Sequence, residues 1–398
     1  MPMTHRDRMF AAIRGEPTDR LPWAPRLDLW YSANKRAGTL PDKYRHASLI
    51  DILDDIDAGL HAVVPDFRDL RSPEDDVDRA LGIYRLHTMP YRTVLTDIRR
   101  TVERAADRTR VTYHTPVGDV SAVTVYDESM RAAGITISHI ETHLWQSGAD
   151  YAPLVHIFEN ARVEPNYSGY SEFAGKVGAR GIAVGFVNGS ASLMHHIQRE
   201  LMTFENFCYE MHDHPDEMSA LADAIGSYWT RVLATAAASP AEVIFLGGNY
   251  DSMITYPPFF AEHIEPWLRR FADDLHSRGK FLLTHTDGEN LGLLPHYLAS
   301  RIDIADSVCP SPMTRLTLKE VRDTFAGRIT IMGGVPSVAL LAESMSDREF
   351  EVFLESFFAD LGPGDHLILG VSDTTPPAAD WRRILRVGQL AKSFCPSA

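Results

Sequence analysis

A histidine and an aspartate two positions apart, in the stretch Lys280-Phe-Leu-Leu-Thr-His285-Thr-Asp287-Gly288, are the residues of this chain best suited to chemistry. A short apolar run precedes them, so we expect a β-strand that ends at this pair. Side chains two positions apart in a strand point to the same face, so His285 and Asp287 can converge just beyond the strand. In parallel α/β folds, ligands and catalysis gather at the carboxyl ends of the strands. A strand that merely ends in a polar turn would have the same pattern.

Other candidate strands end in similar residues, which makes a metal site plausible. A divalent metal needs three or four convergent nitrogen, oxygen or sulfur donors, with one position left open if the site is catalytic. His285, Asp287 and Asp373 could supply one nitrogen and two oxygens, and Cys309 is a fourth candidate. The alternative interpretation is that these residues are capping carboxylates and a buried thiol.

Several other polar residues are candidates for contact with a substrate. Asn249 and Asp251 follow a strand and are expected to orient the substrate during catalysis. Arg26, Asp28 and Asn34 lie in an N-terminal segment that could reach over the same rim. An arginine there would bind a carboxylate or another anion, although a structural Arg–Asp pair explains the first two residues as well. Asn188 belongs to an Asn-Gly-Ser turn after a strand and is a candidate substrate contact or simply a turn residue.

The elements that must position these residues follow a regular order in the second half of the chain. Apolar runs alternate there with helical patterns, and the connections are short, which predicts a parallel sheet. Because about six such units continue with polar residues after nearly every strand, we predict a (β/α)8 TIM barrel. The candidate strands are residues 181–187, 242–246, 280–285, 302–308, 328–332 and 366–370.

The first half of the chain has a different pattern. Residues 19–31 look like a strand, and residues 47–60 look like an amphipathic helix that ends at a glycine. Residues 91–142 alternate around Pro and Gly as antiparallel hairpins do, so we expect a β insertion or flap. We treat residues 1–398 as a single barrel domain with an N-terminal segment and this insertion.

Composition limits the classes of function. Apolar residues make up 44% of the chain, enough for a large core, and the net charge of −15 argues against nucleic-acid binding. The three cysteines are too scattered for a disulfide framework. No apolar stretch approaches the roughly 20 residues of a membrane span, and no signal peptide is evident. These features predict a soluble cytoplasmic protein, and the sequence leaves its oligomeric state open.

Four stretches of the chain stand out together: the opening Arg6-Asp-Arg-Met-Phe-Ala-Ala-Ile-Arg-Gly-Glu-Pro-Thr-Asp-Arg-Leu-Pro-Trp23, residues 280–288, Ile331-Met-Gly-Gly-Val-Pro336 and residues 370–377. In these stretches the chain resembles the uroporphyrinogen decarboxylase superfamily, and in particular its zinc- and corrinoid-dependent methyltransferase branch. The resemblance implies a (β/α)8 barrel with its active site in the barrel mouth.

The resemblance also implies ligands, with one chemical departure. Methyltransferases of that branch hold zinc through a His-x-Cys motif and a distant cysteine. Here His285 matches the histidine, Asp287 stands at the first cysteine, and Asp373 falls near the second. Carboxylates keep the metal a harder Lewis acid than thiolates do. We therefore expect demethylation of an O- or N-methyl small molecule, with the methyl group passing to a corrinoid on a separate partner protein.

Other activities of the same fold stay open. The true decarboxylase needs no metal and holds porphyrin carboxylates through an Arg-rich N-terminal motif, which Lys35-Arg36-Ala-Gly38 resembles only in part. A metal-dependent lyase or hydrolase and a non-catalytic binding barrel are the remaining alternatives.

Overall fold

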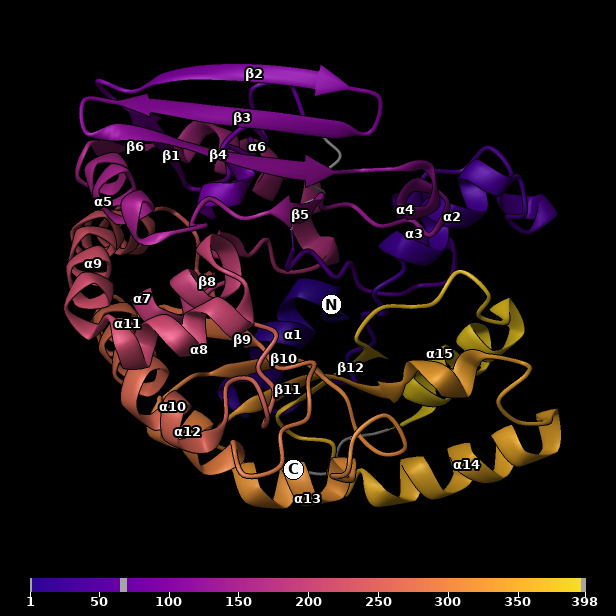
Figure 1. Cartoon of the computed structure of the whole chain (residues 1–398). Helices are drawn as coiled ribbons and strands as arrows, with labels where there is room; N and C mark the ends of the chain where they lie inside the picture. The colour runs from indigo at the N-terminus through magenta and orange to yellow at the C-terminus, as the bar shows by residue number, and fades with distance from the viewer. Residues whose placement is uncertain (1, 65–69, 395–398) are drawn as a thin grey trace.

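The centre of the fold is a parallel sheet of six strands, seen in a computed structural model that describes residues 2–64 and 70–394 (Figure 1). Its order is β12-β11-β10-β9-β8-β7, so each strand pairs with the next one along the chain. Every residue of five of these strands is buried, as expected for a sheet covered on both faces. The strands are β7 (Gly185–Asn188), β8 (Val243–Leu246), β9 (Phe281–His285), β10 (Ile304–Val308), β11 (Thr330–Pro336) and β12 (Leu367–Ser372).

Two short extended segments from the N-terminal region join the two edges of this sheet. In the Trp23 segment (residues 21–25), Trp23 pairs in parallel with Leu369 of β12. In the Leu60 segment (residues 59–63), Leu60 pairs in parallel with Gly181, just ahead of β7. The Gly59 N–H donates to the Trp23 carbonyl at 2.7 Å and links the two segments to each other. Eight parallel elements thus complete a ring, and the predicted (β/α)8 barrel is confirmed.

The expectation of a strand over residues 19–31 is wrong for its second half. Only the Trp23 segment is extended, and α2 (Asp28–Ala37) begins within the predicted strand. The helix ends at Gly38, whose φ of 71° is the left-handed conformation that glycine adopts readily. The residues after Pro25 therefore form a helix, although their alternating polar residues are also typical of a strand.

The predicted helix over residues 47–60 is shorter than expected. Ser48 caps α3 (Leu49–Asp55), and the chain then turns into the Leu60 segment of the barrel. Gly59 does not end a helix. It allows the Leu60 segment to approach the Trp23 segment closely, since a Cβ at Gly59 would lie 3.2 Å from the Trp23 carbonyl oxygen.

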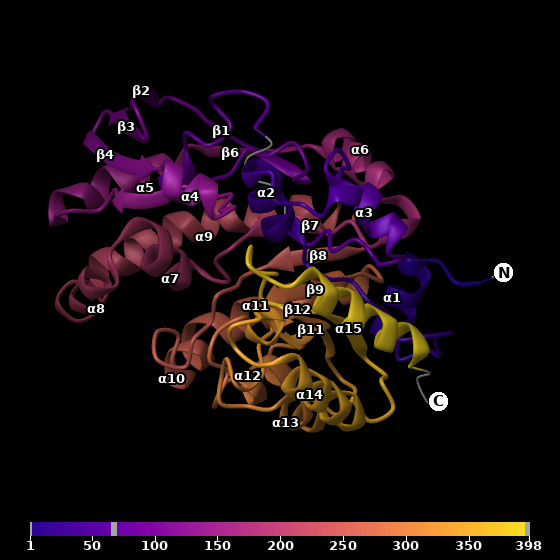
Figure 2. The same ribbon diagram turned by 90° about the vertical axis from the view of Figure 1, so that its right-hand side faces the viewer.

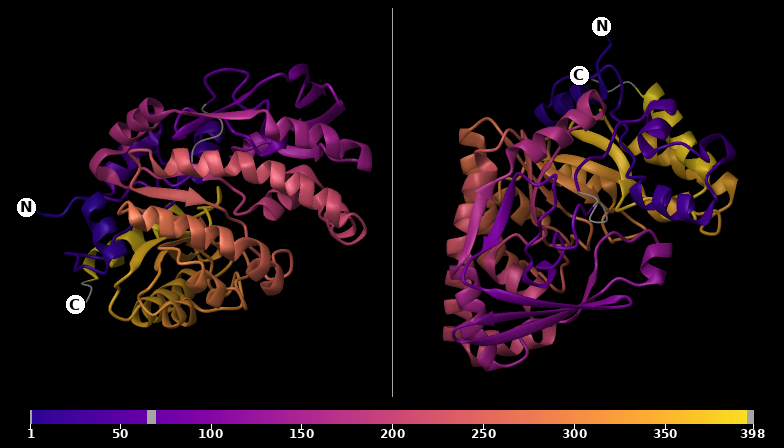
Figure 3. Two further views of the ribbon diagram at one scale, coloured as in Figure 1. Left: turned by 90° about the vertical axis from the view of Figure 1, so that its left-hand side faces the viewer. Right: turned by 90° about the horizontal axis from the view of Figure 1, so that it is seen from above.

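A four-stranded antiparallel sheet forms a separate layer beside the barrel (Figures 1 and 3). Its strands are β2 (Arg99–Ala105), β3 (Arg108–Thr115), β4 (Gly118–Val125) and β5 (His139–Thr142). β1 (Tyr91–Leu95) lies within the predicted insertion but pairs elsewhere, with β6 (Ala161–Pro165). The fully buried Asp78 carboxylate ties the layer to the rest of the chain, because it contacts Arg85, Arg100 of β2 and Tyr113 of β3.

Helices surround the barrel, and both termini lie at the end opposite to the one toward which β8 points (Figure 2). Among the described residues, none of the helices combines the length and the apolarity needed to cross a membrane. The remaining helices are α1 (His5–Arg14), α4 (Glu128–Ala132), α5 (Tyr151–Glu159), α6 (Tyr167–Val177), α7 (Leu193–His196), α8 (Phe204–Asp213), α9 (Pro215–Ala237), α10 (Pro257–Phe259), α11 (Glu265–Ser277), α12 (Leu294–Ala299), α13 (Leu318–Phe325), α14 (Asp347–Asp360) and α15 (Trp381–Ser393).

Candidate metal centre

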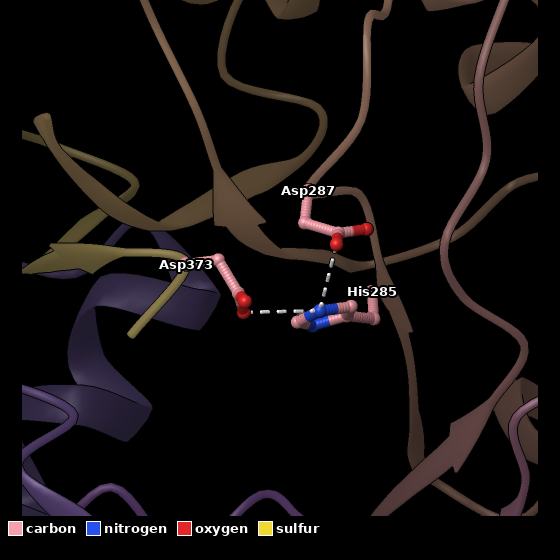
Figure 4. Close-up of side chains that lie close together, drawn as sticks. All are labelled: His285, Asp287 and Asp373. Atoms are coloured by element: carbon pink, nitrogen blue, oxygen red, sulfur yellow. Dashed lines mark ion pairs between the residues drawn. The ribbon is translucent and has the colours of Figure 1, made fainter. Parts of the chain in front are cut away.

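Three of the predicted ligands meet at the carboxyl ends of the barrel strands (Figure 4). His285 is the last residue of β9, Asp287 follows two positions later, and Asp373 comes directly after β12. Nε2 of His285 lies 3.7 Å from Oδ2 of Asp287 and 3.3 Å from Oδ1 of Asp373. Ligands about 2.1 Å from a tetrahedral metal lie roughly 3.4 Å from one another, so this spacing fits a shared cation. Ion pairs have similar distances, so the spacing alone does not decide between them.

The hydrogen bonding of Asp287 favours a cation. Its Oδ2 accepts a hydrogen bond from Nδ2 of Asn249 at 3.0 Å. Its Oδ1 is buried and has no hydrogen-bond partner among the described residues. A buried carboxylate oxygen without a partner is costly, and a metal ion would satisfy it. The donor set of one imidazole and two carboxylates is one that zinc accepts.

His285 is held by a second carboxylate deeper in the barrel. Its Nδ1 donates to Oδ2 of Asp306 at 2.6 Å, which leaves Nε2 facing Asp287 and Asp373. Asp306 lies in β10 and is fully buried, and its Oδ1 accepts a hydrogen bond from Nε2 of His61 at 3.0 Å. A metal-binding histidine usually donates its other ring N–H to such an acceptor.

Asp287 and Asp373 also have supporting contacts. The Asn249 amide that donates to Asp287 accepts a hydrogen bond from Nη1 of Arg199 at 2.7 Å, which fixes its orientation. Nη1 of Arg26 donates to Oδ1 of Asp373 at 2.8 Å, and Nε of Arg26 lies 3.5 Å from Asp28. Each candidate ligand is therefore oriented by neighbouring side chains.

The electrostatics of the cluster show an excess of negative charge. Burial disfavours the charged imidazolium of His285, but the neighbouring Asp287, Asp306 and Asp373 outweigh it and raise the His285 pKa well above its usual value. Burial opposes ionisation of Asp373, yet its hydrogen bond to His285 and the charge of Arg26 lower the Asp373 pKa to about 2. Carboxylates that stay ionised in a buried site provide a favourable environment for a divalent cation.

Cys309 is not part of this cluster. Its Sγ contacts the Ser307 carbonyl at 3.3 Å, and burial together with the nearby acids raises the pKa of the thiol. Among the described residues, the side chains close enough to share a cation are those of His285, Asp287 and Asp373, so the ligand role of Cys309 stays a prediction.

Three other predicted site residues make hydrogen bonds within the fold. The Asn34 amide donates to the carbonyls of Trp30 and Pro377, both at 2.9 Å, and so ties α2 to the loop that carries Asp373. The Asn188 amide donates to the Gly82 carbonyl at 2.9 Å, and its oxygen accepts the Ser190 N–H. The Asp251 carboxylate accepts the Met253 N–H at 2.8 Å within a turn. The substrate-binding roles of Asn34 and Asn188 and the catalytic role of Asp251 stay predictions, since the bond to Met253 engages only Oδ1 of the Asp251 carboxylate.

Three residues with supporting roles were not identified from the sequence. Asp306 could have been noticed in the sequence. It is a charged residue within an apolar strand that should be buried on both faces, and a buried charge needs a partner. His61 lies just past the predicted helix, in what proved to be a barrel element, and Arg199 lies in a helical turn (residues 197–201) without any distinguishing pattern.

Gly248 gives a first test of the cluster. A Cβ at this position would lie 2.8 Å from Cβ of His285, too close for the backbone of β9 to accommodate without a shift. We expect Gly248→Ala to displace the imidazole and weaken divalent-metal binding on the order of tenfold, as do changes to residues that support a ligand. Zinc affinity measured by competition with a chromophoric chelator checks this result.

Gly175→Ala is the matched control, because nothing lies within 4 Å of a Cβ at this position in α6. It should leave zinc affinity unchanged and add up to about 1 kcal/mol of stability, since alanine favours a helix over glycine. Equal zinc affinity of both variants and the original chain would show that His285 is not part of the binding site.

Comparisons with known proteins agree with this architecture. The family model described as uroporphyrinogen decarboxylase (URO-D) matches residues 134–384. Among solved structures, a methyltransferase from Methanosarcina mazei superposes with a TM-score of 0.52 at 12% sequence identity, covering 98% of each chain. At that identity the likeness concerns the fold. A comparison with curated proteins finds no match.

Proposed function

Since the chain belongs to the uroporphyrinogen decarboxylase family, we propose that it is a metal-dependent methyltransferase. It would take a methyl group from the oxygen or nitrogen of a small molecule and pass it to a corrinoid carried by a separate protein. The observation that carries the proposal is the convergence of His285, Asp287 and Asp373, with a buried Asp287 oxygen for which residues 2–64 and 70–394 offer no hydrogen-bond partner. The methyltransferase from Methanosarcina mazei, which shares the fold along its whole length, also supports it.

His285, Asp287 and Asp373 would hold the metal, with zinc as our first choice. When bound, zinc would supply a Lewis acid for the oxygen or nitrogen to which the methyl group is attached. Two carboxylate ligands keep this acid hard, which suits an ether or amine better than a thiol. As the methyl group leaves, the demethylated oxygen or nitrogen takes up a proton. Arg26 lies beside Asp373 and fixes the direction of that carboxylate.

Porphyrinogen decarboxylation, the activity in the family's name, is the second candidate. It fits this site less well, because a substrate with several carboxylates would approach Asp287 and Asp373, with Asp28 also nearby. Arg26, the arginine that contacts a candidate ligand directly among the described residues, already pairs with Asp373 and Asp28. Like charges at short range in a partly buried site repel strongly.

The direct test uses the zinc-loaded protein with free cob(I)alamin and a panel of methyl ethers and methylamines. Formation of methylcobalamin, followed by its absorption spectrum, is the expected result for at least one donor. A parallel incubation with uroporphyrinogen tests the alternative. Decarboxylation without methyl transfer would reject the proposal, and so would inactivity toward the whole panel of methyl donors.

A further inference from the structure

We propose that Asp306 and His61 are positioning residues that set the metal affinity of the site by fixing the imidazole of His285. The inference rests on the proposed function, since it assumes that His285 binds a metal. Neither residue belongs to the three-ligand cluster, and both act through a ligand rather than on the metal.

Asp306 lies where it can reach both histidines. It pairs in register with His285 across the neighbouring strands β10 and β9, so the two side chains share the interior face of the barrel. His61 approaches from the Leu60 segment, which belongs to a different part of the barrel wall. The carboxylate uses Oδ2 for His285 and Oδ1 for His61, at 2.6 Å and 3.0 Å. One fully buried carboxylate thus connects two imidazoles.

This connection determines which nitrogen of His285 faces the metal site. Turning the ring over would point Nδ1 away from Asp306 and replace its 2.6 Å charge-assisted hydrogen bond at Oδ2 with the longer one from Oγ of Ser307, at 3.3 Å, a costly exchange. The ring is therefore fixed with Nε2 toward Asp287 and Asp373 before any metal binds. A ligand fixed in advance loses little conformational freedom on binding, and an anionic acceptor also makes the imidazole a stronger donor to the metal.

His61 acts one step further away. Its hydrogen bond holds the other oxygen of the Asp306 carboxylate, so rotation of that carboxylate away from the His285 ring would break it. Removal of this bond should loosen Asp306 without removing its charge. We therefore expect substitutions of His61 to weaken metal binding in the same direction as substitutions of Asp306, but less.

The experiment measures zinc affinity by chelator competition and records the visible spectrum of the Co²⁺-substituted protein. Asp306→Asn should weaken zinc binding by about 10- to 100-fold, the usual effect of losing an acceptor behind a histidine ligand. It should also change the Co²⁺ spectrum, because the coordinating ring is no longer held in one orientation. His61→Leu should show a smaller loss, and His61→Gln should recover part of it by restoring an N–H donor.

The chain offers a matched control three residues away. Asp303 precedes β10, and it also accepts hydrogen bonds from a histidine, His276, at 2.9 Å and 3.0 Å. Asp303→Asn breaks an imidazole–carboxylate pair next to the same strand but away from the cluster, and it should leave zinc affinity and the Co²⁺ spectrum unchanged.

The outcomes separate this inference from the proposed function. If the unmodified protein binds no zinc, both are overturned. If it binds zinc and Asp306→Asn binds it equally well with the same Co²⁺ spectrum, the positioning role is overturned while the metal site stands. If Asp306→Asn does not fold, the two His61 variants decide: equal zinc affinity of His61→Leu, His61→Gln and the unmodified protein rejects the inference.

Discussion

His285→Ala is expected to remove the bound metal and reduce methyl transfer to background. The unmodified protein should retain about one zinc per chain after dialysis, and the variant should retain almost none. The imidazole is the only nitrogen donor of the cluster and lies between both carboxylates, at 3.3 Å and 3.7 Å. Without it, two acids would have to hold the cation alone. Zinc content by elemental analysis and methylcobalamin formation measure the two effects.

Thermal stability provides an independent check on the same variant. A ligand that binds only the folded state at 100 times its dissociation constant adds about 2.7 kcal/mol of stability. Added zinc should therefore raise the melting temperature of the unmodified protein and leave that of His285→Ala nearly unchanged. His276→Ala, which removes a histidine paired with Asp303 outside the cluster, is the control and should behave like the unmodified protein. Full zinc occupancy in His285→Ala would contradict the proposed site.

Asp78→Ala is expected to cause the largest loss of stability among the substitutions considered, about 3–5 kcal/mol. The Asp78 carboxylate is fully buried and contacts the guanidinium groups of Arg85 and Arg100 and the hydroxyl of Tyr113. Its removal leaves two arginines in a poorly hydrated environment without their counter-charge. The free energy of unfolding measured with urea tests this prediction.

Asp107→Ala is the control for this effect. Asp107 also pairs with an arginine, Arg131, but both side chains are about one-third exposed. Exposed ion pairs contribute at most about 1 kcal/mol, so this variant should unfold close to the midpoint of the unmodified protein. Similar losses for both variants would mean that burial does not determine the importance of the Asp78 contacts.

The six strands in the second half of the chain were predictable, because each is a short apolar run followed by a glycine or a polar residue. The pairing of His285 with Asp287 followed from the two-residue repeat of a strand, and the approach of Asp373 followed from the common direction of parallel strands. These inferences needed only local sequence and the geometry of one sheet.

The supporting residues required information that local sequence does not contain. Asp306 and His61 are adjacent only because β10 and the Leu60 segment belong to one closed ring. Both N-terminal barrel elements pair through single bridges, too short to give an alternating apolar pattern. The role of Arg199 depends on the conformation of Asn249, which has a positive φ of 57°. Sequence patterns do not reveal such a conformation.

The pairing of Trp23 with Leu369 has a consequence for synthesis on the ribosome. The barrel cannot close until β12 has left the exit tunnel, so the early Trp23 segment waits for almost the entire chain to be translated. Contacts between residues so distant in sequence form slowly, because the intervening chain must first be ordered. A nascent chain stalled before residue 367 would expose an unpaired β11 edge, and chaperone binding should persist up to that length.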